Sequence, residues 1–230
     1  MRSEAELRAR RSCEVLDLGR MSYSEALGIQ HRIADERKQG RGTDHLLLVE
    51  HLHVVTIGRN GHEENILISE ARMKQLGIEL FETDRGGDVT YHGPGQAVGY
   101  PIMDLREWKR DVGAFVRAVE QVLIDTLGDF GIKGERVGKC TGVWVGGAKI
   151  AAIGIHLSRW VSTHGWALNV ATDMKYFQYI VPCGLTKPVT SMAELGVRAD
   201  MQDVKDSLAR HFGKVFDFEM QAEPVLTGRF

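Results

Sequence analysis

The sequence predicts an α+β fold, in which helices flank a mixed, largely antiparallel sheet. Residues 44–51 form a continuous apolar run, which is typical of a strand buried on both faces. Residues 142–158 indicate a hairpin, because the Gly146-Gly147 pair suits the positive backbone angles of a tight turn. Apolar residues recur at three- and four-residue spacing within 112–130 and 201–215, which predicts amphipathic helices that pack on the sheet.

Capping residues set the helix boundaries. Asp111 begins the clearest helix, and Ser69 begins a short one that ends at Leu76. Ser22 or Ser24 begins a helix that runs to about residue 38. Its apolar residues fit a helical stripe only partly, so we expect this helix to lie on the surface. Strands are expected at 13–18, 44–51, 53–58, 78–81, 142–158 and 166–170, with two more around the glycine-rich turn in 89–105.

Length and composition indicate an ordinary globular protein. The chain has 230 residues, of which 43% are hydrophobic and 26% are charged, so we expect one domain over residues 1–230. A net charge near −2 gives no general attraction to nucleic acid or to an anionic membrane. Residues 1–15 lack the apolar core of a signal peptide, and no run approaches the ~20 apolar residues of a membrane span. Three widely separated cysteines indicate free thiols, and together these features predict a cytoplasmic protein.

Cys183 is the candidate nucleophile. It stands between Pro182, which fixes one backbone dihedral, and Gly184, which leaves the following amides open to a substrate oxygen. This arrangement suits acyl transfer, in which a cysteine attacks as the thiolate. From this residue alone, a small buried side chain in a turn is the commoner outcome.

Lys149 is the candidate partner of Cys183. It enters an otherwise apolar strand after the Gly146-Gly147 turn, and strand alternation allows it to point inward or outward. A solvated lysine at a strand start is the commoner outcome. In a pocket beside Cys183, it would take the thiol proton and then stabilise the thiolate as an ammonium. A fall of about two units from a thiol pKa near 8.5 would make the cysteine mostly thiolate at neutral pH.

The segment 85–96 is unusually rich in glycine, which permits a ligand to approach the backbone closely. Arg85 and His92 would bind a carbonyl or phosphate group there, but a glycine-rich hairpin bend with a surface arginine explains the same residues equally well. This segment and GERVGKCT both depart in spacing from nucleotide-binding motifs, so no nucleotide cofactor is expected. His51 and His53 would share a strand face, but no cluster of further ligands accompanies them, so no metal site is expected.

Five motifs occur in order between about Asp44 and Met192. They are EHLHVVTIGRN, RGGDVTYHGPGQAVGYPI, GVWVGGAKIAAIGIH, HGWALNV, and PCGL followed by VTSM. Together they resemble the lipoyl(octanoyl) transferase family, whose members move an octanoyl group from acyl carrier protein to a lysine of lipoyl domains. The fold of this family is similar to that of the catalytic domain of biotin and lipoate protein ligases, so the resemblance implies the same fold here.

The resemblance also implies a set of site residues. Cys183 matches the family nucleophile, Lys149 matches its partner, and His51 and Arg59 match a histidine and an arginine of the family pattern. Trp166 stands where a smaller residue is common, which implies a differently shaped acyl pocket. The implied substrate-binding residues are Arg85, Gly86, Gly87, Asp88, Val89, Thr90, Tyr91, His92, Ala152, Ile153, Gly154, Gly165, Trp166 and Ala167.

The implied reaction is a cofactor-free acyl transfer that begins protein lipoylation. Lys149 takes the proton of Cys183, the thiolate accepts the octanoyl group from its carrier protein, and a lysine of an acceptor then receives it. The implied acceptors are the lipoyl domains of 2-oxoacid dehydrogenase E2 subunits and the glycine cleavage H protein. A basic group, Lys133, Arg136 and Lys139, would steer the acidic carrier. Three alternatives stay open: an ATP-dependent lipoate–protein ligase, a transferase that moves octanoyl between lipoyl-dependent proteins, and a non-catalytic regulator that binds the acyl carrier.

Overall fold

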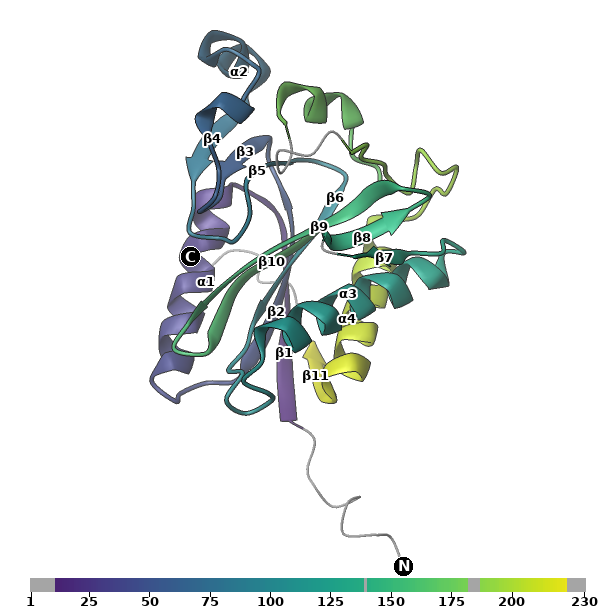
Figure 1. Cartoon of the computed structure of the whole chain (residues 1–230). Helices are drawn as coiled ribbons and strands as arrows, with labels where there is room; N and C mark the ends of the chain where they lie inside the picture. Colours follow the sequence, from purple (N-terminus) through teal and green to yellow (C-terminus); the bar gives the residue numbers. More distant parts are fainter. Residues whose placement is uncertain (1–10, 139, 182–186, 223–230) are drawn as a thin grey trace, which may run out of the picture.

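The computed structural model describes residues 11–138, 140–181 and 187–222, which form two β-sheets with helices around them (Figure 1). The strands are β1 Arg11–Met21, β2 Asp44–His51, β3 Val54–Ile57, β4 Glu79–Glu82, β5 Val89–His92, β6 Gln96–Ile102, β7 Glu135–Val137, β8 Cys140–Val145, β9 Ala148–Ser158, β10 Val161–Asn169 and β11 Phe218–Ala222. The helices are α1 Tyr23–Lys38, η2 Glu63–Asn65, α2 Glu70–Leu76, α3 Val112–Asp129, η3 Met174–Tyr179 and α4 Met201–Phe216, of which η2 and η3 are 3₁₀ helices.

The large sheet has the strand order β11-β1-β2-β6-β10-β9-β8-β7. β1 pairs in parallel with both β11 and β2, and every other neighbouring pair in this sheet is antiparallel. The small sheet has the order β4-β3-β5, in which β3 is parallel to β4 and antiparallel to β5. The predicted α+β fold with a mixed, largely antiparallel sheet is therefore confirmed.

Some strands depart from the sequence prediction. The sequence patterns do not predict β7, which has only three residues, or β11, which follows α4 after the single residue Asp217 with no glycine or proline to mark its start. β10 begins at Val161 rather than at residue 166. The cause is the turn before it, in which Arg159 and Trp160 take positive φ angles of 52° and 68°. A turn built from these two residues carries no glycine signal, so the hairpin of β9 and β10 is invisible in the sequence.

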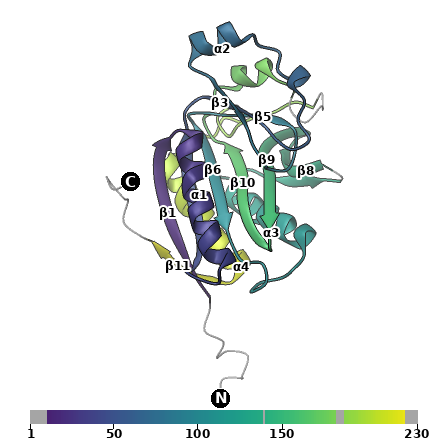
Figure 2. The same cartoon turned by 90° about the vertical axis from the view of Figure 1, so that its left-hand side faces the viewer.

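α1 covers one face of the large sheet (Figure 2). Ser22 caps it, and the cap is a capping box. The expected surface position is wrong for one face of this helix, because Gln30 and Arg37 are buried there and interrupt the apolar stripe. Both side chains are hydrogen-bonded. Gln30 Oε1 accepts from the His164 amide at 2.8 Å, and Arg37 Nε donates to Asp44 Oδ1 at 3.0 Å. Buried polar residues therefore explain the incomplete pattern.

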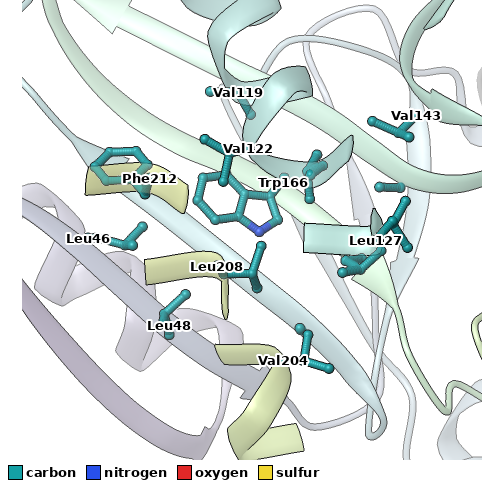
Figure 3. Close-up of a cluster of buried hydrophobic side chains, with 14 of the residues drawn as sticks. Leu46, Leu48, Val119, Val122, Leu127, Val143, Trp166, Val204, Leu208 and Phe212 are labelled. Carbon is teal, nitrogen blue, oxygen red and sulfur yellow. The ribbon is translucent and has the colours of Figure 1, made fainter. Parts of the chain in front are cut away.

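α3 and α4 cover the opposite face, and the largest core lies between them and the sheet (Figure 3). Asp111 caps α3 as predicted, since its side chain accepts from the Ala114 amide. The indole of Trp166, on β10, lies in this core with Val122 of α3 and Leu208 of α4 around it (Figure 3). Within the described ranges, no helix is long and apolar enough to cross a membrane.

The small sheet lies beyond one end of the large sheet, together with α2 (Figures 1 and 2). Ser69 caps α2 as predicted. The small sheet has a core of its own, which includes Val55 of β3, Tyr91 of β5 and Phe177 of η3. The short segment 93–95 joins β5 to β6, so one stretch of chain connects the two sheets directly.

The contact between Trp166 and Gly99 gives a stability prediction. A Cβ added at Gly99 would lie 2.2 Å from the indole Cε2, and the surrounding core leaves the ring little room to move. Gly99→Ala should therefore lower the free energy of unfolding by about 1–3 kcal/mol in urea titrations. Gly28→Ala is the control, because Gly28 is an exposed residue of α1 with no atom within 4 Å of an added Cβ. It should raise stability by about 0.5–1 kcal/mol, and a neutral Gly99→Ala would contradict the packing.

Candidate active site

A cavity of about 380 Å³ lies beside β9. One wall comes from residues 85–87 and from β5, a second from β9 and β10, and a third from the first turns of α3 with the start of β8. All of the predicted substrate-binding residues line the cavity except Asp88, Val89 and Tyr91, and Lys149 lines it as well. Three sequence motifs that are distant along the chain therefore meet at one cavity.

Several lining residues are not predicted by the sequence analysis. His164 directly precedes the predicted Gly165, so the HGWALNV motif could have pointed to it. Ile155 directly follows the predicted Gly154, and Tyr100 lies within the motif of residues 85–102, so the motifs could have pointed to these two as well, whereas the rest lie outside the motifs. The unpredicted lining residues are Tyr23, Tyr100, Val112, Val116, Cys140, Thr141, Ile155 and His164.

Close contact between backbones shapes the cavity wall. The Gly86 amide donates to the Ile155 carbonyl at 3.1 Å, so the segment 85–87 is held against the edge of β9. A Cβ added at Gly154 would lie 2.6 Å from the Gly86 carbonyl oxygen, and one added at Gly58 would lie 2.4 Å from the Gly87 oxygen. Only glycine permits three backbones to approach this closely, which explains why glycine occurs at these positions.

Arg85 holds the shape of this segment. Its side chain is buried, so the alternative of a surface arginine is wrong. The guanidinium Nε donates to Thr56 Oγ1 at 3.0 Å, and Nη2 donates to the carbonyls of Thr56 and Asp88 at 2.8 and 2.6 Å. Nη1 also donates to the Gly86 carbonyl at 3.2 Å. These bonds fix the loop between β4 and β5 against β3, with Arg85 forming part of the cavity wall.

Two buried histidines lie at the cavity: His92 lines it, and the ring of His51 lies next to that of His92. Burial lowers the pKa of His51 to about 4 and that of His92, which lines the cavity, to about 3. His92 Nδ1 donates to Gln96 Oε1 at 2.8 Å, and His51 Nε2 accepts from the Tyr100 hydroxyl at 2.7 Å. Both rings are therefore neutral at neutral pH, and they add no charge to the region that surrounds the cavity.

His164 sits at the cavity in an unusual backbone conformation. Its φ is 57°, the left-handed region that favours glycine, and its side chain is almost fully buried. Its Nε2 donates to Asp84 Oδ1 at 2.7 Å, and Asp84 Oδ2 lies 3.4 Å from His156 Nε2. Burial lowers the pKa of His164, although the bond to Asp84 opposes this shift. The carboxylate thus orients the imidazole toward one tautomer.

Lys149 lies on the cavity wall, and its backbone is bonded on both sides of the residue. Its amide donates to the Pro188 carbonyl at 2.8 Å, and its carbonyl accepts from the Thr190 amide at 2.9 Å. Its Nζ is 4.9 Å from the centroid of the Trp144 ring, a cation–π distance. The inward alternative for this lysine is the one the structure has.

Cys183 belongs to 182–186 and lies outside the described residues. A second cysteine, Cys140, lines the cavity, and Lys187 Nζ lies 3.5 Å from its Sγ. Cys13 is buried in the core, and burial raises the pKa of its thiol. The cavity therefore has a described thiol on its wall that the sequence analysis does not assign to the site.

Most of the chain matches a known protein family. Residues 22–213 match the family described as the lipoyl protein ligase A/B catalytic domain. An octanoyltransferase of Solibacter usitatus is 65% identical over 210 residues, which cover 91% of this chain and 96% of that protein. The chain belongs to the octanoyltransferase family. An octanoyltransferase of Koribacter versatilis is 51% identical over 210 residues and covers 88% of this chain and 84% of its own.

Solved structures confirm the fold of this octanoyltransferase-family chain. A bipartite lipoate protein ligase of Thermoplasma acidophilum superimposes with a TM-score of 0.71 at 16% identity, over 96% of this chain and 89% of that one. Biotin protein ligase of Aquifex aeolicus, in complex with biotin and ATP, gives a TM-score of 0.54 at 12% identity over 89% and 70%. The expected similarity to the catalytic domains of lipoate and biotin protein ligases is thus confirmed.

Two further sequence expectations concern charge and metal. Arg136 of the basic group donates to Glu120 Oε2 at 2.9 Å and to the Arg117 carbonyl at 2.9 Å, so its charge is already paired. Lys133 is exposed, and Lys139 lies outside the described residues. In the part of the chain that the structure describes, no group of three or more histidine, cysteine, aspartate or glutamate residues is arranged to hold a metal ion.

The neutral His51 predicts a loss of stability in acid. Its pKa is near 6.5 in an unfolded chain and about 4 in the folded protein, so only the unfolded state takes up a proton as the pH falls between these values. Between about pH 7.5 and pH 5, this should remove about 2 kcal/mol from the free energy of unfolding. His51→Gln should show a flatter pH dependence in urea titrations. An equal slope in both proteins would contradict a neutral His51.

Proposed function

We propose that this member of the octanoyltransferase family moves an octanoyl group from octanoyl-acyl carrier protein to a lysine of lipoyl domains. Cys183 is the nucleophile and Lys149 its base. The observation that carries the proposal is the position of Lys149 on the wall of the cavity that the family motifs surround. The acceptors are the lipoyl domains of 2-oxoacid dehydrogenase E2 subunits and the glycine cleavage H protein.

The cavity suits an acyl chain. Val112, Val116, Ile153 and Ile155 give it apolar side chains, and His92 adds a neutral ring rather than a charge. Burying about seven methylenes at roughly 0.8 kcal/mol each contributes on the order of 5 kcal/mol, which favours a medium chain over acetyl. One methylene more or less changes binding by only about 1–3 kcal/mol, so neighbouring chain lengths should be discriminated less strongly.

The chemistry proceeds in two balanced steps. Lys149 takes the thiol proton of Cys183, the thiolate attacks the thioester carbonyl, and the carrier thiol leaves with the proton returned by Lys149. The amine of the acceptor lysine then attacks the acyl-enzyme, the Cys183 thiolate leaves, and Lys149 transfers the proton of the amine to it. A thioester becomes an amide, which is downhill and consumes no ATP.

The surroundings of Lys149 support this role. The Trp144 face attracts a cation, so it stabilises the ammonium that forms when the lysine holds a proton. Pro188, which bonds to the Lys149 amide, follows Cys183 by five residues, so a short stretch of chain links nucleophile and base. A base whose backbone is fixed by two hydrogen bonds starts from a defined position for proton transfer.

The nucleophile assignment predicts a covalent intermediate. After incubation with octanoyl-acyl carrier protein, intact mass spectrometry should show a gain of one octanoyl group, and peptide mapping should place it on Cys183. Cys183→Ala should abolish the gain and the transfer. Lys149→Ala should reduce the acylation rate by at least about a hundredfold, because the thiol loses its general base.

Cys140→Ser is the matched control, because Cys140 is a described thiol that lines the cavity. This variant should still form the acyl-enzyme. Octanoyl found on Cys140 would contradict the assignment. Transfer by Cys183→Ala that requires ATP would favour a lipoate–protein ligase, and an unimpaired cellular function of Cys183→Ala would favour a regulator that binds the acyl carrier.

A further inference from the structure

β5 has two faces with different surroundings. Thr90 and His92 point to one side and line the cavity, whereas Val89 and Tyr91 point to the other side and join the core of the small sheet. This alternation is the ordinary geometry of a strand. It explains why Val89 and Tyr91 are absent from the cavity wall, whereas Asp88 precedes the strand and is absent because its carboxylate bonds to Asn65 and to the Val89 amide.

Asp88 is bonded to a segment that pairs with the residues just before 182–186. Its Oδ1 accepts from the Val89 amide at 2.7 Å, and its Oδ2 accepts from Asn65 Nδ2 at 2.8 Å. The Asn65 carbonyl in turn accepts from the Val181 amide at 2.8 Å. Next to it, Ile66 pairs with Ile180, so the contact is a short antiparallel ladder rather than a single bond.

Tyr91 packs against η3, the helix that leads into the same segment. Its hydroxyl lies 2.7 Å from His53 Nδ1, and its ring stacks on Tyr176 of η3 with centroids 4.9 Å apart and planes within 7°. His53 stacks on the same Tyr176 ring at 4.4 Å, and Phe177 meets Tyr91 edge to face at 5.5 Å. Tyr91 is fully buried, so this cluster holds η3 firmly against β5.

We propose that Asp88 and Tyr91 are positioning residues, which fix the chain that leads to Cys183 relative to the acyl cavity. The inference rests on the proposed function. Arg85 completes the connection, because its guanidinium binds the Asp88 carbonyl while its segment forms the cavity wall. One face of β5 thus borders the cavity for the acyl chain, and the other face packs against the chain that leads to Cys183. A displacement of about 1 Å between reacting groups can cost on the order of a hundredfold in rate.

A side-chain exchange between Asp88 and Asn65 tests the proposal. In Asn65→Asp, two carboxylates face each other, whereas in Asp88→Asn, the amide at 88 accepts from Val89 and donates to the Asn65 amide oxygen once the Asn65 amide turns over. In the double variant, the amide at 88 accepts from Val89 and donates to the carboxylate at 65, so the bond is restored with reversed polarity. Asn65→Asp should lower the single-turnover acylation rate of Cys183 about tenfold at saturating donor with little change in donor KM, Asp88→Asn should change the rate little, and the double variant should recover most of the loss caused by Asn65→Asp.

Hydrogen exchange at the Val181 amide is the second measurement, because that amide bonds to the Asn65 carbonyl. Exchange should be faster in Asn65→Asp, and it should return toward the original rate in the double variant. Tyr91→Phe, which keeps the stacked ring and removes one hydrogen bond, should slow acylation about fivefold. Asp125→Asn is the matched control, since Asp125 accepts from the Gln121 side chain on α3 at 2.7 Å, and it should change neither measurement.

The outcomes separate the two proposals. A double variant that acylates no faster than Asn65→Asp, with all variants folded, would overturn the positioning role. So would unchanged exchange at Val181, or single variants that raise the donor KM and leave the saturated acylation rate unchanged, since the latter would return Asp88 to substrate binding. Failure of the unsubstituted protein to form any acyl-enzyme would instead overturn the proposed function. The hydrogen-exchange data would in that case still show whether Asp88 and Asn65 hold Val181 in place.

Discussion

The hydrogen bond from the Gly86 amide to the Ile155 carbonyl joins the small sheet to the large one beside the cavity. β8 pairs with β9 only as far as Ala151, so the rest of that side of β9 needs another partner. The segment 85–87 takes this place, and the space left between it, the start of β8 and α3 becomes the cavity. The site therefore exists because two strands of different length leave part of β9 to a loop.

The junction between the two sheets depends on three glycines, which have no side chain, and on the buried charge of Arg85. Gly58, Gly86 and Gly154 let three backbones meet, and the Arg85 guanidinium bonds to the carbonyls of Thr56 and Asp88 and to the Thr56 hydroxyl. A buried cation is costly unless its hydrogen bonds are satisfied, which is why a polar residue at this place must be so fully engaged. The same bonds make the loop rigid, and a rigid wall is what a site needs to select one chain length over a much shorter one.

The sequence predicted those helices, strands and turns well whose signals lie in neighbouring residues. Capping at Ser22, Ser69 and Asp111 and the strand at 44–51 follow from short-range chemistry, and so does the Gly146-Gly147 turn. The sequence could not predict the faces that tertiary contacts decide. Family resemblance assigned residues 85–92 to substrate as a block, yet strand alternation turns Val89 and Tyr91 away from the cavity, and the Asp88 carboxylate bonds to Asn65. The buried polar residues of α1 were hidden because tertiary contacts decide their burial, whereas the turn before β10 was hidden because Arg159 and Trp160 give no glycine signal.

The backbone of His164 has a consequence for efforts to improve this protein. A non-glycine residue at a φ of 57° costs free energy, of order 1–3 kcal/mol, that the rest of the fold must offset. Selection for heat resistance alone would favour glycine here, and with it the loss of the imidazole that bonds to Asp84 beside the cavity. At position 164, a substitution that relieves the backbone strain would thus remove a side chain of the site. A directed-evolution library for thermal stability should therefore keep His164 unchanged.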